Sequence, residues 1–288
     1  MSQTLELDSP LEGTLYIVAT PIGNLKDITR RAVETFESVD WIAAEDTRHT
    51  RPLLQALGIN KPLISLHEHN EAYRSTQLLE KLKAGENGAL VSDAGTPLIN
   101  DPGYYLVKLL REESVEVVPI PGPSAVITAL CAAGLPTDRF SYEGFLPAKS
   151  GKRKLVLASL VSDVRTLVFY ESPHRILATL TDLESVMGSE RQIVIARELT
   201  KKFEQFVSGT VAEVLAYFTE NSGKVRGEFV LMVTGDVEKP AVELSEWDGL
   251  IEVLLKQGLP VKQISEIVAE YAGVKKKPVY QRVLELKD

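Results

Sequence analysis

The chain has almost no cysteine and no long apolar run. Cys131 is the only cysteine among its 288 residues, so no disulfide can join two parts of the chain, and this usage suits a reducing compartment. No uninterrupted apolar stretch approaches the roughly 20 residues that cross a bilayer. The acidic first twelve residues lack the basic and apolar regions of a secretion signal. The sequence therefore predicts a cytoplasmic protein that is not targeted to a membrane.

Excess positive charge and the common nucleotide-binding fingerprints are also missing. The formal net charge is -8, so a nucleic-acid partner would have to meet a local basic patch. Neither GxxxxGK[ST] nor GxGxxG occurs, which disfavours nucleoside triphosphates and nicotinamide cofactors. His67 and His69 form an HxH pattern, but no third ligand has suitable local spacing, so we expect no metal site.

What the sequence does have is a regular alternation of two kinds of segment. With 44% hydrophobic residues, the chain can bury a sizeable core in two domains and an appendage. From residue 13 to residue 123, short apolar runs predict strands: TLYIVA, WIAAE, PLISL, GALVS and VEVVPIPG. Amphipathic runs between them predict helices: ITRRAVETF, RPLLQALG, EAYRSTQLLEKLKAG and YYLVKLL. This alternation is typical of a parallel sheet with helices on both faces.

A second alternating set follows the proline-rich stretch at residues 119–123. Its expected strands are RTLVFYES, RQIVIARE, KFEQFVSG and GEFVLMVTG, and residues 175–187 and 211–218 are expected to be helical. Beyond Pro240 only short helical segments remain, with a spacing that resembles a helix-turn-helix unit. We therefore predict an α/β fold of two αβα domains with mainly parallel sheets and a helical tail, divided into residues 13–123, 124–239 and 240–288.

Three loops rich in glycine and proline follow expected strands. The longest, SDAGTPLINDPG at residues 92–103, follows the apolar run at residues 89–91. ATPIGNLKDIT at residues 19–29 and PGPSA at residues 121–125 are the other two. Because the carboxyl ends of parallel strands share one edge of a sheet, we expect the three loops to lie together and cradle a ligand. Plain turns without a ligand are the alternative.

Side chains suited to proton transfer end two of the expected strands. Asp46 follows WIAAE and His67 follows PLISL, so the two predict an acid/base pair if they are desolvated. It is equally consistent with the sequence that Asp46 caps the next helix and that His67 lies with His69 on a solvated turn. Glu171, in FYESPHR, either faces a cationic ligand or simply begins a helix, where its charge favours the positive end of the dipole.

Two basic clusters are candidate contacts for a phosphate backbone. They consist of Lys149, Lys152, Arg153 and Lys154, and of Lys275, Lys276, Lys277 and Arg282. Such clusters are the electrostatic footprint of nucleic-acid binding. The tail from residue 241 onward has seven Lys or Arg against eight acids, however, so a solvated surface explains its cluster at least as well.

Taken together, the motifs resemble the tetrapyrrole methylase superfamily of S-adenosylmethionine (SAM) enzymes. The resemblance covers residues 13 to about 239 and is carried by YIVATPIGNLKDIT, AAEDTRHT, SDAGTPLINDPG, PIPGPSAVITALCAAGLP, YEGFLP and FYESPHR. Within the superfamily, the chain is most similar to the branch that methylates the ribose 2'-hydroxyl of a cytidine in the decoding region of 16S rRNA in the small ribosomal subunit. That branch also carries a small helix-turn-helix-like addition, as the tail of this chain does.

The resemblance implies a class III SAM methyltransferase-like fold with the cofactor in the interdomain cleft. From the first domain and its boundary, the residues at cofactor-binding positions are Ala94, Gly95, Thr96, Ile99, Ser124 and Ala125. From the second domain they are Glu171, Leu199, Glu228 and Phe229. The family likeness further implies a homodimer.

The likeness also bears on the catalytic residues and on the substrate. The branch that methylates porphyrinogens has a proton acceptor where Asp46 stands and a Lys donor where His67 stands, and it has Asp where this chain has Asn24 and Thr96. These differences disfavour a macrocyclic substrate. The match at the acceptor position makes Asp46, assisted by His67, the candidate that accepts the proton of a ribose hydroxyl. Two alternatives stay open: a small-molecule methyltransferase of the same fold, and a ribosome assembly factor without turnover.

Overall fold

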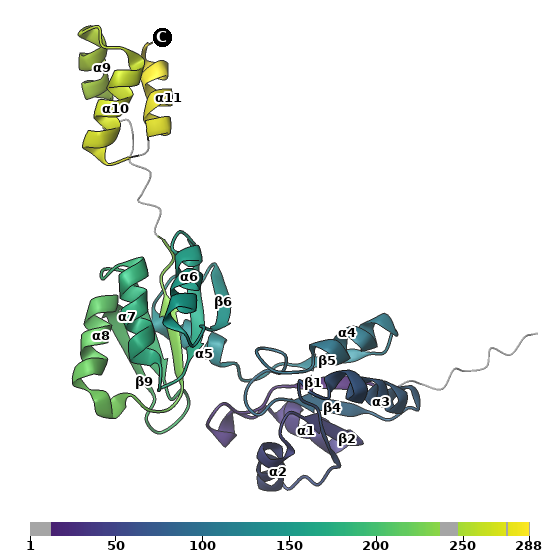
Figure 1. Ribbon diagram of the computed structural model, residues 1–288. Helices are drawn as coiled ribbons and strands as arrows, with labels where there is room; N and C mark the ends of the chain where they lie inside the picture. Colours follow the sequence, from purple (N-terminus) through teal and green to yellow (C-terminus); the bar gives the residue numbers. More distant parts are fainter. Residues whose placement is uncertain (1–12, 237–246, 275, 288) are drawn as a thin grey trace, which may run out of the picture. The chain divides into compact units, whose positions relative to one another are not determined.

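A computed structural model describes residues 13–236, 247–274 and 276–287 of the chain (Figure 1). The first sheet consists of β1 (Leu15–Val18), β2 (Trp41–Ala44), β3 (Leu63–Ser65), β4 (Gly88–Val91) and β5 (Val117–Ile120). Its strand order is β3-β2-β4-β1-β5, and every neighbouring pair is parallel. The loops that leave β1, β4 and β5 therefore begin at one edge of the sheet.

Helices cover both faces of this sheet. The covering helices are α1 (Arg30–Ser38), α2 (Thr47–Ala56), α3 (Glu71–Lys83) and α4 (Tyr104–Glu112), and the short helix η1 (Leu25–Asp27), which buries no residue, precedes α1. Phe36 of α1 and Leu54 of α2 are buried in the apolar cluster on one face, while Leu82 of α3 and Leu110 of α4 are buried in the cluster on the other. Burial on both sides explains why the strands are apolar runs rather than alternating patterns.

The second sheet is mixed. Its strands are β6 (Phe140–Phe145), β7 (Thr166–Glu171), β8 (Gln192–Arg197), β9 (Gln205–Thr210) and β10 (Phe229–Val233), in the order β6-β7-β10-β8-β9. Only β6 and β7 are parallel; the other three neighbouring pairs are antiparallel. The α/β class is confirmed, but the expectation that this sheet is mainly parallel is wrong. Residues 198–204 between β8 and β9 are too few for the crossover that a parallel pair requires.

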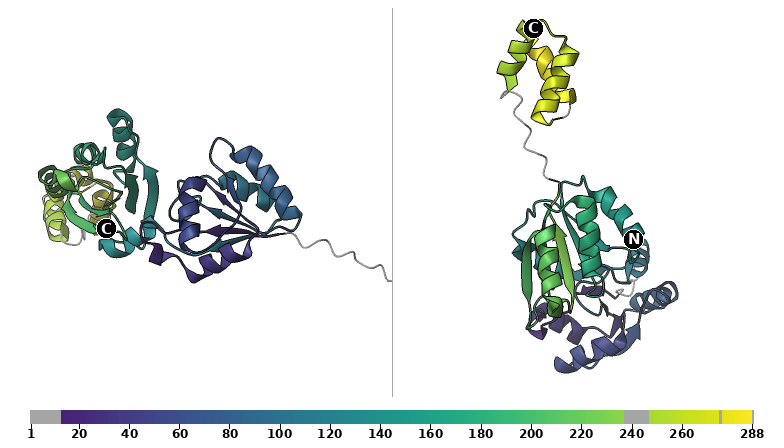
Figure 2. Two further views of the ribbon diagram at one scale, coloured as in Figure 1. Left: turned by 90° about the horizontal axis from the view of Figure 1, so that it is seen from below. Right: turned by 60° about the vertical axis from the view of Figure 1, so that its left-hand side comes forward.

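The second sheet also lies between layers of helices, which are α5 (Ala125–Ala133), α6 (Ser150–Leu160), α7 (Ile176–Met187), α8 (Val211–Glu220) and η2 (Ser222–Lys224). Figures 1 and 2 show α7 and α8 side by side, and together with α6 they bury apolar side chains on one face. On the other face, Val126 and Leu130 of α5 pack with Ile22 from the loop after β1. The second sheet therefore contacts the edge of the first sheet where the glycine loops lie.

The tail forms a compact unit of its own, and the division between the two units falls after Thr234. Its described part contains α9 (Asp248–Lys256), α10 (Val261–Ala272) and α11 (Lys276–Lys287) around an apolar core that includes Ile251, Ile264 and Val279. The predicted boundary between residues 239 and 240 lies outside the described residues. Within those residues, no helix combines the length and apolarity that crossing a bilayer requires.

Candidate ligand site at the glycine loops

Hydrogen bonds join the three glycine loops into one structure. Thr20, after β1, and Gly95, after β4, exchange two backbone hydrogen bonds with N to O distances of 2.9 and 3.0 Å. The Thr96 hydroxyl donates to the carbonyl oxygen of Pro123, after β5, at 3.0 Å. The loops thus lie together at the carboxyl edge of the first sheet, as their positions in the sequence predict.

The loop at residues 92–103 is held in an unusual backbone conformation. Its φ angles are positive at Gly95 (81°) and Gly103 (127°), and also at Asn100 (72°) and at Leu98 (71°), whose side chain makes this region unfavourable. The Glu71 carboxylate holds the end of the loop by accepting hydrogen bonds from the backbone of Gly103 at 3.0 Å and of Tyr105 at 2.7 Å. Strain that the surroundings maintain is typical of ligand-gripping segments.

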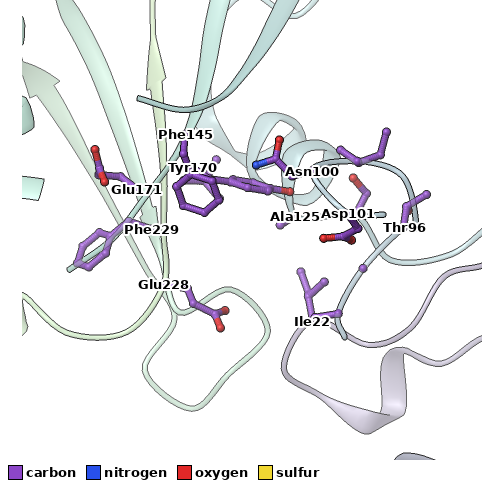
Figure 3. Close-up of a pocket in the computed structure, with 15 residues that line it drawn as sticks. Ile22, Thr96, Asn100, Asp101, Ala125, Phe145, Tyr170, Glu171, Glu228 and Phe229 are labelled. Atoms are coloured by element: carbon purple, nitrogen blue, oxygen red, sulfur yellow. The ribbon is translucent and has the colours of Figure 1, made fainter. Parts of the chain in front are cut away.

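A cavity of about 300 Å³ opens at these loops (Figure 3). This volume is at the lower end of the range for small-molecule sites. Both sheets contribute to the lining, which consists of Ile22, Ala94, Gly95, Thr96, Ile99, Asn100, Asp101, Ser124, Ala125, Phe145, Tyr170, Glu171, Glu228, Phe229 and Val230. The structure thereby brings together nine of the ten residues at predicted cofactor positions. Leu199 does not line the cavity and is buried behind it, in the same apolar cluster as Ile22 and Val230.

The predicted residues from the second sheet differ in how free they are to meet a ligand. Glu171 is buried, and its carboxylate accepts hydrogen bonds from the Thr179 hydroxyl at 2.7 Å and from the Ser172 backbone at 2.7 Å. It also pairs with the Arg175 guanidinium at 2.8 Å, so it holds the start of α7 together. Glu228, by contrast, has a side chain that is 76% exposed and an ion pair with Lys201 at 2.9 Å.

Two titratable groups of the lining have perturbed proton affinity. Burial raises the pKa of the Asp101 carboxyl; a hydrogen bond from Ser92 opposes this effect, and the nearby charge of Asp93 adds to it. Burial also raises the pKa of the Tyr170 hydroxyl. Sequence reasoning missed Asp101, although it lies in the longest glycine loop.

Asp46 lies outside this lining and caps α2. Its carboxylate accepts a hydrogen bond from the Arg48 backbone at 2.8 Å and pairs with the Arg48 guanidinium at 2.6 Å. Hydrogen bonds from Arg48 hold the pKa of the Asp46 carboxyl well below its usual value. A carboxylate with such low proton affinity is a weak base. The role of Asp46 as proton acceptor stays a prediction, while its alternative role as helix cap matches the geometry.

His67 is oriented by the turn that follows β3. Its backbone N–H donates to Asn70 Oδ1 at 2.9 Å, and its ring Nε2 lies 3.2 Å from Asn70 Nδ2. His69 meets the same ring edge-on, with centroids 5.9 Å apart. Among the described residues, no hydrogen-bond partner reaches the buried His67 Nδ1. The predicted assistance of His67 to Asp46 stays a prediction.

A different histidine forms a carboxylate pair near the loops. His49 Nδ1 lies 2.8 Å from Asp93 Oδ2, and this hydrogen bond raises the pKa of the imidazole. The other oxygen of Asp93 accepts from the Asp46 backbone at 3.1 Å. His49 and Asp93 line a separate depression of about 240 Å³ beside Pro21. No three His, Cys, Asp or Glu side chains in the described parts of the chain are grouped as metal ligands.

The first basic cluster is divided by burial. Arg153 is 3% exposed, and its guanidinium pairs with the buried Asp182 at 2.7 Å, so it joins α6 to α7 instead of facing a partner. Lys154 reaches the same carboxylate at 3.5 Å. Lys149 and Lys152 are exposed. The cluster thus presents two lysines to solvent, and its arginine is an interior residue.

The second basic cluster is partly neutralised within the tail. Arg282 Nε donates to Asp248 Oδ1 at 2.9 Å, and Lys276 pairs with Glu266. Lys277 is exposed at the start of α11. Lys275 lies outside the described residues.

Comparison with known proteins first establishes the class. Residues 14–215 match the family model of the tetrapyrrole (corrin/porphyrin) methylases, and the chain therefore belongs to that family. Residues 242–287 match a second family model, the RsmI C-terminal HTH domain. The family inferred from the motifs is confirmed.

Close relatives narrow the family to one group. Ribosomal RNA small subunit methyltransferase I of Escherichia coli O157:H7 is 54% identical over 275 residues, which cover 95% of this chain and 96% of the relative. The proteins of the same name from Synechocystis and Pasteurella multocida are 52% and 51% identical, covering 95% and 96% of this chain and 98% of each relative. Within the tetrapyrrole methylases, the chain belongs with the ribosomal RNA small subunit methyltransferase I proteins.

Solved structures confirm the fold at low sequence identity. Diphthine synthase superposes with a TM-score of 0.60 at 15% identity, over 77% of this chain and 90% of its own. Uroporphyrin-III C-methyl transferase of Thermus thermophilus, complexed with S-adenyl homocysteine, superposes with a TM-score of 0.53 at 18% identity. The superposition covers 77% of this chain and 97% of the transferase.

Proposed function

We propose that this chain is a SAM-dependent methyltransferase of 16S rRNA that modifies the ribose 2'-hydroxyl of a cytidine in the decoding region of the small ribosomal subunit. The observation that carries the proposal is the full-length identity of about half to proteins named ribosomal RNA small subunit methyltransferase I. The cavity at the three glycine loops supplies the matching site.

The backbone chemistry of the cavity suits the cofactor. The positive φ of Gly95 and its hydrogen bonds to Thr20 bring bare backbone to the cavity wall, where a ligand can approach closely. We assign the cofactor to the predicted residues that line the cavity, with Leu199 supporting the wall from behind. These residues are Ala94, Gly95, Thr96, Ile99, Ser124, Ala125, Glu171, Glu228 and Phe229. When bound, SAM supplies a methyl group on a positively charged sulfur.

The chain's own residues provide orientation and exclusion of water. Ile22, Ile99 and Val230 give the lining an apolar part, while Asp101 and Glu228 place negative charge where a cationic ligand is favoured. A fixed reaction geometry in a cavity with little water supplies much of the acceleration of a methyl transfer.

Recognition of RNA is assigned to the exposed lysines. The exposed members of the two basic clusters are Lys149, at the N-cap of α6, Lys152 on α6 and Lys277 on α11. Lys276 keeps one ion pair within the tail. The net charge of -8 repels a phosphate backbone overall, so binding depends on these local patches. Family likeness extends the proposal to a homodimer in the cytoplasm, which size-exclusion chromatography with light scattering and cell fractionation test.

Methyl transfer from radiolabelled SAM to small ribosomal subunits tests the function. The expected result is label in 16S rRNA that maps to one cytidine ribose when wild-type chain is added. Binding to the subunit without transfer would support the assembly-factor alternative. Transfer to a tetrapyrrole but not to rRNA would support the small-molecule alternative, which Asn24 and Thr96 disfavour.

A further inference from the structure

Methylation of a hydroxyl requires a group that takes up the hydroxyl proton. Resting on the proposed function, we propose that Asp101 is the catalytic residue that accepts this proton at the cavity of the glycine loops. Asp101 lines the cavity together with Thr96 and Ile99 of the same loop, residues 92–103, whereas Asp46 does not line the cavity. A base must lie within hydrogen-bond reach of the reacting hydroxyl, so this placement is the first argument for Asp101.

The backbone around Asp101 fixes where its carboxylate points. Asn100, immediately before it, has a φ of 72°, and the Glu71 carboxylate holds Gly103 two residues beyond it. At Gly103 a Cβ would approach Leu90 Cδ2 to 2.8 Å, so this end of the loop packs closely on β4. Figure 3 shows the Asp101 carboxylate directed from the loop toward the open space of the cavity. The strained loop thus presents one carboxylate to whatever occupies the cavity.

The surroundings of Asp101 favour uptake of a proton. Its carboxyl is about half buried, and it interacts electrostatically with Asp93, Glu45 and the hydroxyl groups of Tyr142 and Tyr170. Burial raises its pKa, a hydrogen bond from Ser92 opposes this, and the Asp93 charge adds to it.

Asp46 has the opposite environment. Arg48 lies against its carboxylate and lowers its proton affinity, while the groups around Asp101 are acidic or neutral. Because the strength of a general base increases with its proton affinity, Asp101 is the stronger base of the two.

The transfer balances with Asp101 in this role. The hydroxyl oxygen forms a bond to the methyl carbon while the carbon–sulfur bond breaks and leaves its electron pair on sulfur. The hydroxyl proton passes to a carboxylate oxygen of Asp101. The positive charge of the sulfonium and the negative charge of the Asp101 carboxylate are both lost, so the transfer removes one pair of opposite charges from the site.

Asp101→Asn separates this role from others. The substitution keeps the shape of the side chain and removes the basic oxygen. We expect turnover on small ribosomal subunits to fall at least about 100-fold. The KM for the subunit and the calorimetric affinity for S-adenosylhomocysteine should change by no more than roughly twofold, because the lost interaction belongs to the transition state. Binding of S-adenosylhomocysteine also shows that the variant is folded.

A second readout does not depend on turnover. Carbon-13 NMR of labelled aspartate carboxyls, assigned by comparison with Asp101→Asn, follows the titration of Asp101 in the free chain. We expect it to titrate above the usual aspartate value. The pH profile of wild-type kcat/KM, which reports groups of the free chain, should fall on the acid side with the same midpoint, since protonated Asp101 cannot accept a proton.

Matched variants give every outcome a meaning. Asp138→Asn removes an exposed carboxylate outside the lining and should keep wild-type turnover. If Asp46→Asn abolishes turnover while Asp101→Asn does not, the proposal is overturned in favour of Asp46. A tenfold loss of S-adenosylhomocysteine affinity in Asp101→Asn with turnover kept at saturation would make Asp101 a cofactor anchor instead. An NMR titration of Asp101 at or below the usual aspartate value also overturns the proposal.

A wild-type chain that binds S-adenosylhomocysteine but methylates no rRNA refutes the proposed function, irrespective of Asp101.

Discussion

Removing the charge of Arg153 should destabilise the fold rather than weaken RNA binding directly. The guanidinium lies 2.7 Å from Asp182 through both Nε and Nη2, and the two side chains are 3% and 7% exposed. Burial alone would raise the pKa of Asp182, but hydrogen bonds from Ser150 and Arg153 keep it below its usual value. Breaking such a buried pair costs about 3 to 5 kcal/mol. Because Ser150 and Lys154 still reach Asp182, we take about 3 kcal/mol for Arg153→Met.

This loss corresponds to a fall in Tm of roughly 6 to 12 °C for a unit of this size. Lys152→Met, one residue away on the exposed face of α6, is the matched control and should leave Tm unchanged while reducing RNA affinity. Thermal melting by circular dichroism and filter binding of rRNA are measured on the same preparations. The reasoning is refuted if Arg153→Met melts with the wild type and yet binds RNA more weakly, because Arg153 would then contact RNA itself.

The remaining predictions concern the cavity and the tail. Gly95→Val should weaken SAM binding at least tenfold, about 1.4 kcal/mol, because a β-branched residue disfavours a φ of 81° and its Cβ would meet Ile22 Cγ2 at 3.4 Å. If calorimetry on the folded variant shows unchanged affinity, the cofactor binds elsewhere. The raised pKa of Asp101 means that the folded state keeps a proton which the unfolded chain has released above about pH 4. The contribution of Asp101 to the stability of the fold therefore decreases as the pH rises from about 4 through the pKa of the folded state, and Asp101→Asn should be more stable than the wild type at neutral pH. Urea unfolding midpoints that are the same for both proteins from acid to neutral pH would contradict this. Lys276→Glu with Lys277→Glu should lower rRNA affinity and flatten its salt dependence while SAM affinity persists, and wild-type filter binding across a salt series would assign RNA contacts away from the tail.

The first half of the fold followed from the sequence because its signals are local. Each of the apolar runs between residues 14 and 122 contains a strand, and two of the helices between them, α2 and α3, end near Gly58 and Gly85, both with positive φ. The second half was less predictable. β6 is an edge strand whose residues are mostly exposed or half buried, so it lacks an apolar run. Whether the other strands run parallel or antiparallel depends on the insertion of β10 between β7 and β8, and the hydrophobic periodicity of the sequence does not indicate this order.

Helices α5 and α6 show two other limits. AVITALCAA in α5 is apolar nearly throughout, so it has no amphipathic signature, although Ile127 and Cys131 are exposed. The start of α6 was interpreted only as a basic cluster. Its Arg153 is an interior residue because Asp182, 29 positions away, compensates its charge.

The position of the site was predictable, but the orientation of its carboxylates was not. The pattern of parallel strands places the three loops at one edge of the sheet, and residues of these loops contribute to the cavity. Whether Asp93 or Asp101 faces that cavity depends on the backbone between them, where Leu98 and Asn100 adopt positive φ. Composition does not reveal this, since leucine rarely adopts positive φ, and asparagine tolerates it without requiring it.

The arrangement of the first sheet has a consequence for synthesis on the ribosome. β1 pairs with β4 and β5, and Ile17 lies opposite Pro119, 102 residues later. At about 5 to 20 residues per second, roughly 5 to 20 s pass between the two positions. During that interval the apolar LYIV segment lacks at least one of its two strand partners, so this is the stage at which chaperones that shield nascent apolar segments should matter most for the chain.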